Sequence, residues 1–548
     1  MGRNQSYAVA GVAGLALADA GIVALALPPL LLALHTTVAG VAAVLAVYAL
    51  VLGLALPAAG HLAAGAAGRV GGVGVVVFAL ASLGCGLVSS LPLLLVLRGV
   101  QAAGGAAMLA AAFALLADGA ADGGPQWRAA TLLGTATGPA LGGAITQVLG
   151  WRAIFLVQAP LVLLALPAFS RAARPRVAEG GRLPHGALVV RAGLALALVS
   201  AALTAVIFLT VLLLVTGWSV EPLAAAVVVS VLPLAAVAGA RIRGAPAGRA
   251  AAGSLLVAAG TVCLAFVPTD TLWWVVGPEA LAGIGMGLAL PALAGDLLPE
   301  RTVRQASALL STRHLGIAVG LAVLAPVMTS SINGALDSAR LHGAALILDA
   351  RIDPLAKLNI APQLAGAVNT EQPLAGVRKV FRDGADAISD DQRADWNRLG
   401  RRASQTLVAS VNDAFSPGYA VGAGLALLAA LAVAPWPSRR QVAIALAVVA
   451  IAVLIPVAYA LGADRARPPP VTLGDPCKPR NLPETGGIGG FVQDTALVAL
   501  DRAACHAHSS REALVLALAS DGAAKAYKAR YGLDPRSITG LLGAVIGG

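Results

Sequence analysis

The sequence predicts an all-α, multi-pass membrane protein, and two observations carry this prediction. Of the 548 residues, 58% are hydrophobic and only 12% are charged, whereas soluble domains carry about 25% charged residues. Apolar runs of about 20 residues, enough to cross a bilayer as a helix, recur along the chain, and the alternating pattern of a membrane β-barrel is absent. Because a backbone inside lipid must satisfy its own hydrogen bonds, we expect these runs to be α-helices.

Thirteen runs are expected to span the membrane. The first follows Arg3 and carries Asp19, so we expect it to remain as a spanning helix rather than to be cleaved as a signal peptide. The runs are 8–34, 39–60, 70–89, 93–117, 129–150, 152–170, 192–216, 222–241, 250–267, 272–296, 303–329, 418–436 and 441–462.

The distribution of arginines predicts the orientation. If the N-terminus is cytoplasmic, the cytoplasmic segments hold most of the arginines, among them Arg69, Arg128 and Arg249, and the short outside loops hold only Arg152. By the positive-inside rule this places the N-terminus in the cytoplasm and, with thirteen spans, the C-terminus outside. These loops account for the net charge of +11, so we expect the lipid bilayer of the cytoplasmic (inner) membrane as the surroundings and no nucleic-acid partner.

The order of the runs predicts two halves of six helices, a layout typical of transporters built from repeats. Two soluble pieces interrupt it, both expected outside, and the second reads as helical at 488–504, 509–521 and 535–546. The expected units are a first half at 1–170, a basic cytoplasmic linker at 171–191, a second half at 192–436 with an extracytoplasmic insert at 330–417, an extra transmembrane helix at 437–462 and an extracytoplasmic helical domain at 463–548.

Asp19 is the most informative single residue because it interrupts the first apolar run. A carboxylate at the centre of a membrane helix costs about 2.5–3.5 kcal/mol on insertion scales, and such residues mark ion or proton pathways. We therefore expect an ion or proton site at Asp19. A helix that begins later, with Asp19 near the interface, is the alternative.

Several strings along the chain carry a family resemblance. They are Leu17-Ala18-Asp19-Ala20-Gly21-Ile22-Val23-Ala24-Leu25-Ala26-Leu27-Pro28, Arg98-Gly99-Val100-Gln101-Ala102, Gly134-Thr135-Ala136-Thr137-Gly138-Pro139-Ala140-Leu141-Gly142-Gly143, Gly150-Trp151-Arg152-Ala153-Ile154-Phe155 and Thr312-Arg313-His314-Leu315-Gly316. Together they resemble motifs of the major facilitator superfamily and, within it, of the drug:proton antiporters related to fourteen-helix exporters. The two extra central helices of those exporters are missing here.

The resemblance implies a proton-coupling role for Asp19. Arg98 or Arg313 is then the expected cation beside it, because each lies several residues inside an apolar run. A static ion pair that locks helices together is the alternative for Asp19, and a side chain that snorkels to the outer interface is the alternative for Arg98.

Three further polar residues belong to the expected coupling or substrate network. Glu279, which follows Pro278, is a second expected proton-coupling residue, with an exposed position near the outer mouth as the alternative. Gln101 is expected to hydrogen-bond in the same pocket or to make a plain helix contact. His314 titrates near neutral pH in its unperturbed form, and a structural hydrogen bond is its alternative role.

A helix-flexing motif is expected at Gly134, Gly138, Pro139 and Gly142. Small residues four positions apart let two helices approach closely, and proline removes a backbone hydrogen bond and permits bending. The resemblance assigns such a helix to the rocking motion of alternating access; tight packing alone is the other interpretation.

One segment departs from the family pattern. Gly60-His61-Leu62-Ala63-Ala64-Gly65-Ala66-Ala67-Gly68-Arg69 stands where relatives carry an acidic residue and several basic ones. Ala64 replaces the acid, so the charge network that steadies the outward-facing state of relatives is in doubt here.

Cys477 and Cys505 both fall in the domain expected outside, where a disulfide is the natural state of two cysteines. Cys505, His506 and His508 as metal ligands are the alternative, although their spacing matches no common site. We expect no metal and no cofactor, and no phosphate-binding loop for ATP is present.

The function that the sequence favours is proton-coupled export of hydrophobic or amphipathic, drug-like compounds rather than enzymatic catalysis. Export of an envelope lipid or glycolipid is one alternative. A sensor or scaffold on a transporter-like frame, with residues 463–548 bound to an envelope partner, is the other.

Overall fold

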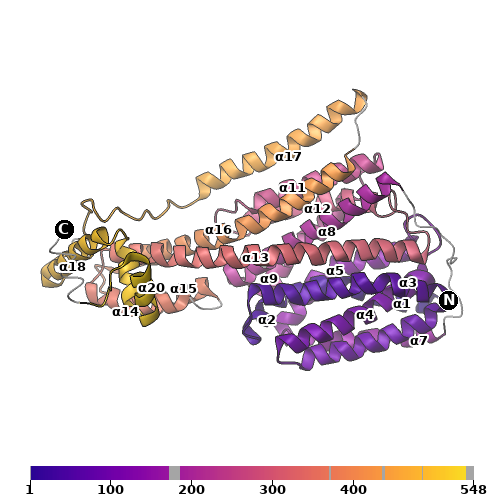
Figure 1. Cartoon of the computed structure of the whole chain (residues 1–548), viewed down its shortest axis with the longest axis horizontal. Coiled ribbons are helices and arrows are strands. Elements are labelled where there is room, and N and C mark those ends of the chain that lie inside the picture. The colour runs from indigo at the N-terminus through magenta and orange to yellow at the C-terminus, as the bar shows by residue number, and fades with distance from the viewer. Residues whose placement is uncertain (1, 172–185, 369–371, 435–438, 484, 538–548) are drawn as a thin grey trace.

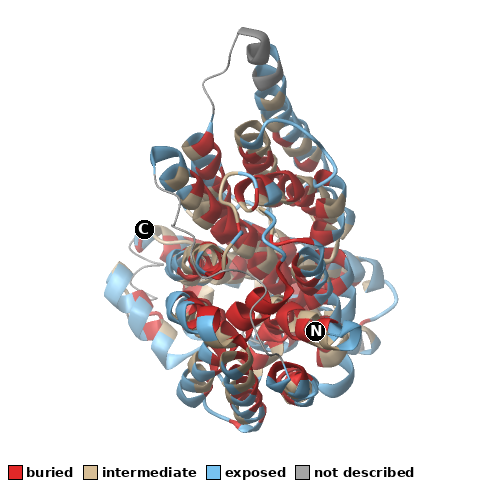
Figure 2. Cartoon of the chain, turned by 90° about the vertical axis from the view of Figure 1, so that its right-hand side faces the viewer, coloured by how far each residue is buried: buried red, intermediate tan, exposed pale blue. Residues whose placement is uncertain are grey.

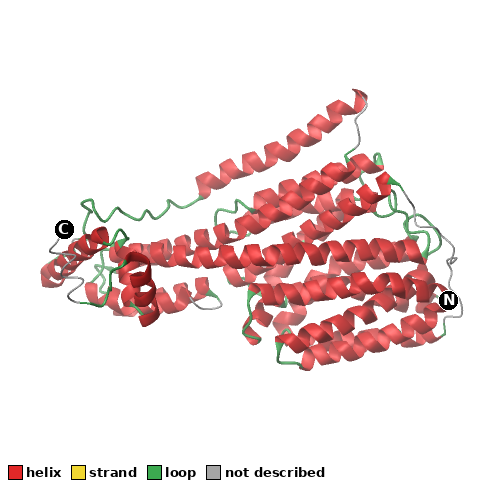
Figure 3. Cartoon of the chain, in the orientation of Figure 1, coloured by secondary structure: helices red, strands yellow, loops and turns green. Residues whose placement is uncertain are grey.

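The computed structural model describes residues 2–171, 186–368, 372–434, 439–483 and 485–537. These residues form helices joined by loops and no β-strand; one isolated bridge pairs Ala294 with Leu298 (Figure 3). The predicted all-α fold is confirmed over this part of the chain. The predicted linker at 171–191 and the predicted helix at 535–546 lie mostly outside the described residues.

The helices fall into three groups along the chain (Figure 1). The first group is α1 (Arg3–Ala24), α2 (Leu27–Ala33), α3 (Val38–Leu87), α4 (Leu91–Leu116), α5 (Pro125–Leu149), α6 (Ala153–Leu163) and α7 (Leu166–Ser170). The second is α8 (Ala187–Leu212), the π-helix η1 (Leu213–Gly217), α9 (Pro222–Val229), α10 (Val231–Gly239), α11 (Pro246–Leu264), α12 (Trp273–Leu293) and α13 (Val303–Leu348). The third is α14 (Pro354–Val368), α15 (Pro373–Asp383), the 3-10 helix η2 (Ala385–Ala387), α16 (Arg393–Val433), α17 (Arg439–Ala466), α18 (Gly487–His506), α19 (Arg511–Leu518) and α20 (Asp521–Tyr531).

Among the described residues, eleven helical segments are long and apolar enough to cross a membrane. Large apolar side chains such as Leu54, Leu80 and Leu431 are exposed on the outside of the bundle, while the buried residues line its interior (Figure 2). A soluble protein rarely exposes so much apolar surface, so the chain is a multi-pass membrane protein. Because α3 has 50 residues and α5 is not among the eleven, the count of thirteen spans stays a prediction.

The second and third expected runs form the two arms of α3, which are joined by a sharp kink and not by a longer loop. Only Ala66 has a non-helical backbone inside α3, with φ −144° and ψ 44°. The Cβ position of Gly105 lies 3.0 Å from the Tyr48 hydroxyl and 3.7 Å from Phe78, so the two arms of α3 lie side by side and the chain reverses near Ala66. The reversal lies between the two expected runs, and the connection is shorter than expected because its alanine-rich sequence favours helix.

Proline residues bend two of the predicted spans. Pro28 lies in the first turn of α2 and Pro167 in the first turn of α7, where the missing N–H needs no partner. The chain therefore leaves α1 after Ala24, and α6 after Leu163, before each helix resumes. The runs at 8–34 and 152–170 are thus bent spans and not straight helices.

The helices pack into two bundles that contact each other along α3 with α13 and along α5 with α9. Within the first bundle, α3 packs against α4 and α1 against α5; within the second, α11 packs against α12 and α16 against α8. The arrangement matches the two expected halves, although their exact boundaries stay a prediction.

A helical head projects from one end of the bundle, opposite the end where the N-terminus lies (Figure 1). We define the head as α14, α15, α18, α19, α20 and the outer parts of α13 and α16. The predicted insert limits at 330 and 417 fall inside α13 and α16, which both continue out of the bundle without a break. In the core of the head, Trp396 packs edge-on against Phe381 with 5.2 Å between ring centroids, and its indole donates to the Phe381 carbonyl.

The helix α17 lies at the outer edge of the second bundle, where it packs mainly on α11 (Figure 1). The Tyr459 hydroxyl donates to the Trp274 carbonyl at 2.6 Å, and the two rings meet edge-to-face. Leu446, Leu454 and Leu461 are exposed, as lipid-facing side chains are.

Candidate functional site

A buried ion pair joins α1 to α4 inside the first bundle. The Nη2 atom of Arg98 lies 2.7 Å from Oδ2 of Asp19, and Nη1 donates to Oδ1 at 3.1 Å. Both side chains are fully buried, so the guanidinium holds the carboxylate through two parallel hydrogen bonds. Since α1 begins at Arg3, the alternative of a later helix start is wrong, and buried Arg98 does not snorkel to an interface.

Amides and a hydroxyl complete this network. Gln101 accepts from Arg98 Nη1 at 2.6 Å and donates to the Ser82 hydroxyl at 2.7 Å. Gln158 of α6 accepts from Gln101 at 3.2 Å and donates to Asp19 Oδ1 at 3.2 Å. Four elements, α1, α3, α4 and α6, therefore meet at one polar cluster, as buried polar groups require.

An aromatic side chain covers the guanidinium. The Tyr48 ring lies with its centroid 4.2 Å from Arg98 Cζ, in cation–π geometry, and the Tyr48 hydroxyl donates to the Ala16 carbonyl. Sequence reasoning did not predict Tyr48, Ser82 or Gln158. Gln158 had a usable signal, because it is a lone amide between apolar residues of its run.

Close packing of α5 on α1 holds Asp19 in place. A Cβ atom on Gly134 would lie 2.2 Å from the Gly14 carbonyl oxygen, and one on Gly142 would lie 2.4 Å from the Ile22 carbonyl oxygen. A Cβ on Gly138 would lie 2.8 Å from the Ala18 carbonyl, next to Asp19. The glycines of the predicted motif thus face α1, which fits the packing interpretation and leaves flexing as a prediction.

Glu279 lies in the second bundle, away from the Asp19 network. Its side chain is fully buried in α12, and neither carboxylate oxygen has a hydrogen-bond partner among the described residues. Its polar neighbours are the hydroxyls of Thr210 on α8 and Tyr419 on α16, which lie 3.2 Å apart. The alternative of an exposed residue at the outer mouth is therefore wrong.

Arg313 and His314 do not reach Asp19. Arg313 forms no hydrogen bond or ion pair within the described chain, and the charge that faces it is Glu300. The His314 Nδ1 atom lies 2.7 Å from the Leu310 carbonyl oxygen, one turn earlier in α13. Of the two cations expected beside Asp19, Arg98 forms the pair and Arg313 does not. His314 makes the structural hydrogen bond that was its alternative role.

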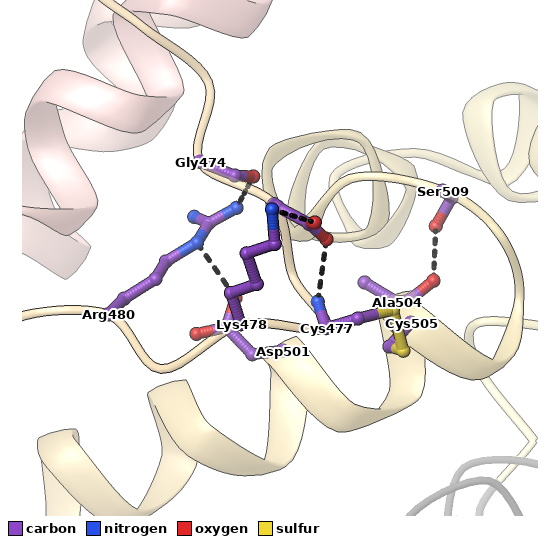
Figure 4. The surroundings of a disulfide bond; sticks show 9 residues. Gly474, Cys477, Lys478, Arg480, Asp501, Ala504, Cys505 and Ser509 are labelled. Carbon is purple, nitrogen blue, oxygen red and sulfur yellow. Dashed lines mark hydrogen bonds and ion pairs between the residues drawn. A yellow bond between two sulfur atoms is a disulfide. The ribbon is translucent and has the colours of Figure 1, made fainter.

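A disulfide between Cys477 and Cys505 fixes the start of the C-terminal part of the head onto α18 (Figure 4). The Cα atoms are 5.0 Å apart, and Cys505 is thereby unavailable as a metal ligand. No group of three potential ligands for a metal was found among the residues that the structure describes.

Beside the disulfide lies a charged cluster that joins α18 and α19 to the outer end of α13. Arg511 is fully buried and lies 2.6 Å from Asp349 and 3.5 Å from Asp501. Arg480 lies 3.6 Å from Asp501 (Figure 4). It also lies 2.9 Å from Glu512. Burial raises the pKa of Asp501, and the charges of Arg511 and Arg480 oppose that rise.

Comparisons with known proteins agree with this architecture. The chain resembles a bacterial homologue of the human lysosomal transporter Spinster in its inward-facing, unoccupied state, with a TM-score of 0.51 and 16% identity over 78% of this chain and 97% of the other. The same homologue in its occupied state also has a TM-score of 0.51, at 17% identity over 77% of this chain and 96% of the other. At such low identity these likenesses describe the fold alone.

Curated relatives match shorter stretches. Multidrug resistance protein Stp of Mycobacterium tuberculosis is 37% identical over 100 residues, 17% of this chain and 19% of that protein. The cephamycin export protein CmcT of Amycolatopsis lactamdurans is 38% identical over 137 residues, 22% and 27% of the two chains. The tetracenomycin C resistance and export protein of Streptomyces glaucescens is 34% identical over 160 residues, 27% and 29%. The matches thus span less than a third of each relative.

The fold defines a polytopic membrane protein. The sequence profile of the Major Facilitator Superfamily matches residues 9–321, more than half of the chain. The chain belongs to the Major Facilitator Superfamily, as its motifs predicted. This family places the chain among transporters rather than enzymes.

Proposed function

We propose that this protein is a proton-coupled exporter of hydrophobic or amphipathic, drug-like compounds that works by alternating access. The observation that carries the proposal is the fully buried, two-point contact of Asp19 with Arg98 inside the first bundle. The names of the partial relatives, which include export and multidrug resistance proteins, favour drug-like cargo. We infer an inner-membrane location, with the N-terminus cytoplasmic and the head outside.

The pair offers a direct way to couple a proton to a change of packing. A proton on Asp19 cancels the charge that Arg98 balances, and Arg98 then keeps its contacts with Gln101 and the Val44 carbonyl. Because a buried charge without its partner is costly, the two protonation states favour different arrangements of α1 and α4. We expect the rearrangement that admits substrate to accompany release of the proton from Asp19.

Glu279 is the proposed second proton carrier. A charged carboxylate without a cation is costly inside a membrane protein, whereas a protonated one can donate to the Thr210 or Tyr419 hydroxyl. Glu279 lies in the second bundle and Asp19 in the first, so each half holds one of the two proposed proton carriers.

Flux in proteoliposomes tests this function. A pH gradient should drive uptake of a fluorescent hydrophobic cation into vesicles that contain the full chain, and a protonophore should abolish it. Gradient-independent flux would contradict the coupling. No flux of any tested compound would favour the sensor or scaffold interpretation.

A second candidate, export of an envelope lipid, is favoured by one observation. Leu355 and Leu358 on α14 and Ile488, Phe491 and Val492 on α18 are exposed on the head, and Gly489 lies beside Pro354 where the two helices meet. Exposed apolar patches of this kind often mark contact sites for apolar partners. If the cargo is a lipid, Ile488→Ser with Phe491→Ser should block its release to acceptor vesicles but leave drug flux unchanged, and Gln363→Ala on the exposed face of α14 serves as the control.

A further inference from the structure

A loop of the second half reaches across to the first half at the end of the bundle where the N-terminus lies. The loop joins α12 to α13, and in it the Glu300 amide donates to the Ala121 carbonyl at 2.7 Å. The Trp127 indole N–H, in the first turn of α5, donates to Glu300 Oε2 at 2.8 Å. One residue of the second half therefore contacts both the loop before α5 and α5 itself.

Glu300 is buried at this contact, with 7% of its surface exposed. The Trp127 ring is buried as well and packs edge-to-face on Phe113, with 5.0 Å between centroids. The indole is thus held by its own half, and its N–H points at the carboxylate of the other half.

The charges around Glu300 leave its carboxylate without an ion pair among the described residues. Asp122 faces it from the first half and is already paired with Arg128 at 2.8 Å. Arg313 faces it from α13, beyond ion-pair distance. Asp296, the other acid of the loop, pairs with Arg249 of its own half. Burial raises the pKa of Glu300 to about 7.

The contact of α3 with α13 at the same end of the bundle is made by uncharged groups. Gly60 lies against Ser307, and the Ser311 hydroxyl donates to the Gly53 carbonyl. Among the residues that the structure describes, Glu300 is an acid whose side chain bonds across the two halves at this end.

We propose that Glu300 is a positioning residue that latches the two halves together at the end where the N-terminus lies, and that protonation of its carboxyl tightens the latch. The proposal rests on alternating access, because a latch matters only if the two halves separate there.

The direction in which pH shifts the balance of latched and open protein follows from the surroundings of the Glu300 carboxyl. In the latched state the pKa of Glu300 is raised to about 7, whereas an open, hydrated glutamate titrates near 4.5. The latched state therefore binds the proton more tightly, and its added stability is full below about pH 4.5 and is lost as the pH rises through 7. Between pH 5 and 8 the ratio of latched to open protein should fall on the order of 50-fold.

Distance measurements between spin labels test the latch without any flux. Labels at Arg69→Cys and Arg243→Cys, both exposed and one in each half, report separation of the halves in the reconstituted full chain. Two variants probe the contact: Glu300→Gln keeps an acceptor for Trp127 but cannot titrate, and Trp127→Phe keeps the ring but loses the N–H. Asp296→Asn is the matched control, because it removes an acid of the same loop whose ion pair is with Arg249 of its own half.

We expect the long-distance population of the wild type and of Asp296→Asn to grow as the pH rises from 5 to 8. Glu300→Gln should change less than twofold over this range and stay mostly latched. Trp127→Phe should lower the latched population about fivefold or more at pH 8, since it leaves a buried carboxylate without its donor. A wild type that ignores pH, or a Glu300→Gln protein that follows the wild-type profile, would overturn the proposal. A normal distance profile with no substrate flux would instead overturn the proposed transport function and leave the latch standing.

Discussion

At the scale of single residues, the pairing of Asp19 with Arg98 is the interaction on which the most depends. Both groups are fully buried, and the carboxylate takes three hydrogen bonds, two from Arg98 and one from Gln158. Removing one partner of such a pair strands a buried charge, which is far costlier than removing both.

This asymmetry gives a stability prediction. Arg98→Met should lower the free energy of unfolding by about 3–5 kcal/mol, because Asp19 loses its cation. The double variant Asp19→Asn with Arg98→Met should regain a large part of that loss. Thermal unfolding in detergent, followed by size-exclusion chromatography, measures both; a double variant less stable than Arg98→Met would contradict the stranded-charge argument.

The sequence identified some members of this site and missed others for a physical reason. Asp19, Arg98 and Gln101 stand out because polar groups are rare inside apolar runs. Which cation Asp19 would meet depended on which helices are neighbours, and periodicity within one helix holds no such information. Arg313 was therefore an equal alternative to Arg98, and Ser82 and Tyr48 were invisible because a hydroxyl in a membrane helix is common.

At the scale of elements, the crossing of α1 and α5 is set by glycine. The predicted four-residue spacing of Gly134, Gly138 and Gly142 places each at a backbone carbonyl of α1. Backbone cannot move aside as a side chain can, so a methyl group added here must push the two helices apart.

Gly142→Ala should therefore separate α1 from α5, lower the melting temperature by several degrees and displace Asp19. Gly193→Ala in α8 is the matched control, since nothing lies within 4 Å of its Cβ position and alanine favours helix there. Melting temperatures of the two variants in the same detergent decide the matter. Equal effects would mean that the α1–α5 contact is loose.

In the head, the Arg511 cluster and the disulfide together hold the C-terminal helices α18 and α19 against the end of α13. Arg511→Ala removes one of the two cations that Asp501 and Glu512 share and takes from Asp349 its ion-pair partner. We therefore expect α18 and α19 to lose protection against hydrogen exchange by about tenfold or more. Arg530→Ala, an exposed change in α20, should alter nothing. Unchanged exchange in Arg511→Ala would show that the cluster does not hold the head.

Element prediction from the sequence was strong for helix existence and weak for helix ends. Apolar runs marked the spans because burial in lipid demands them. The continuation of α13 to Leu348 and the start of α16 at Arg393 were missed, because polar helices outside lipid carry no apolar signal. The reversal between the runs 39–60 and 70–89 was expected, but not that Ala66 alone leaves helical geometry there, because its neighbours include good helix formers.

At the scale of the whole molecule, two bundles meet at both of their ends. Near the head, the Gln147 side chain accepts from the Leu223 amide at 2.8 Å and donates to Glu221 at 3.0 Å. At the opposite end the Glu300 contact closes the bundle. Alternating access requires that one set of contacts open while the other holds.

The predicted topology places the head outside the cell. A membrane-impermeant maleimide added to intact cells should label Cys477 and Cys505 only after reduction, because they form a disulfide and the buried Cys85 and Cys263 do not react. Labelling that requires lysis as well as reduction would put the head in the cytoplasm and contradict the thirteen-span prediction.

The most direct test of the central claim is proton movement during transport. Proteoliposomes with an internal pH dye should show substrate-dependent proton flow for the wild type and for Asp390→Asn, an exposed control in the head. Asp19→Asn should lose at least tenfold of that flow and of gradient-driven substrate uptake. Wild-type proton flow in folded Asp19→Asn would contradict the role of Asp19 as the coupling carboxylate.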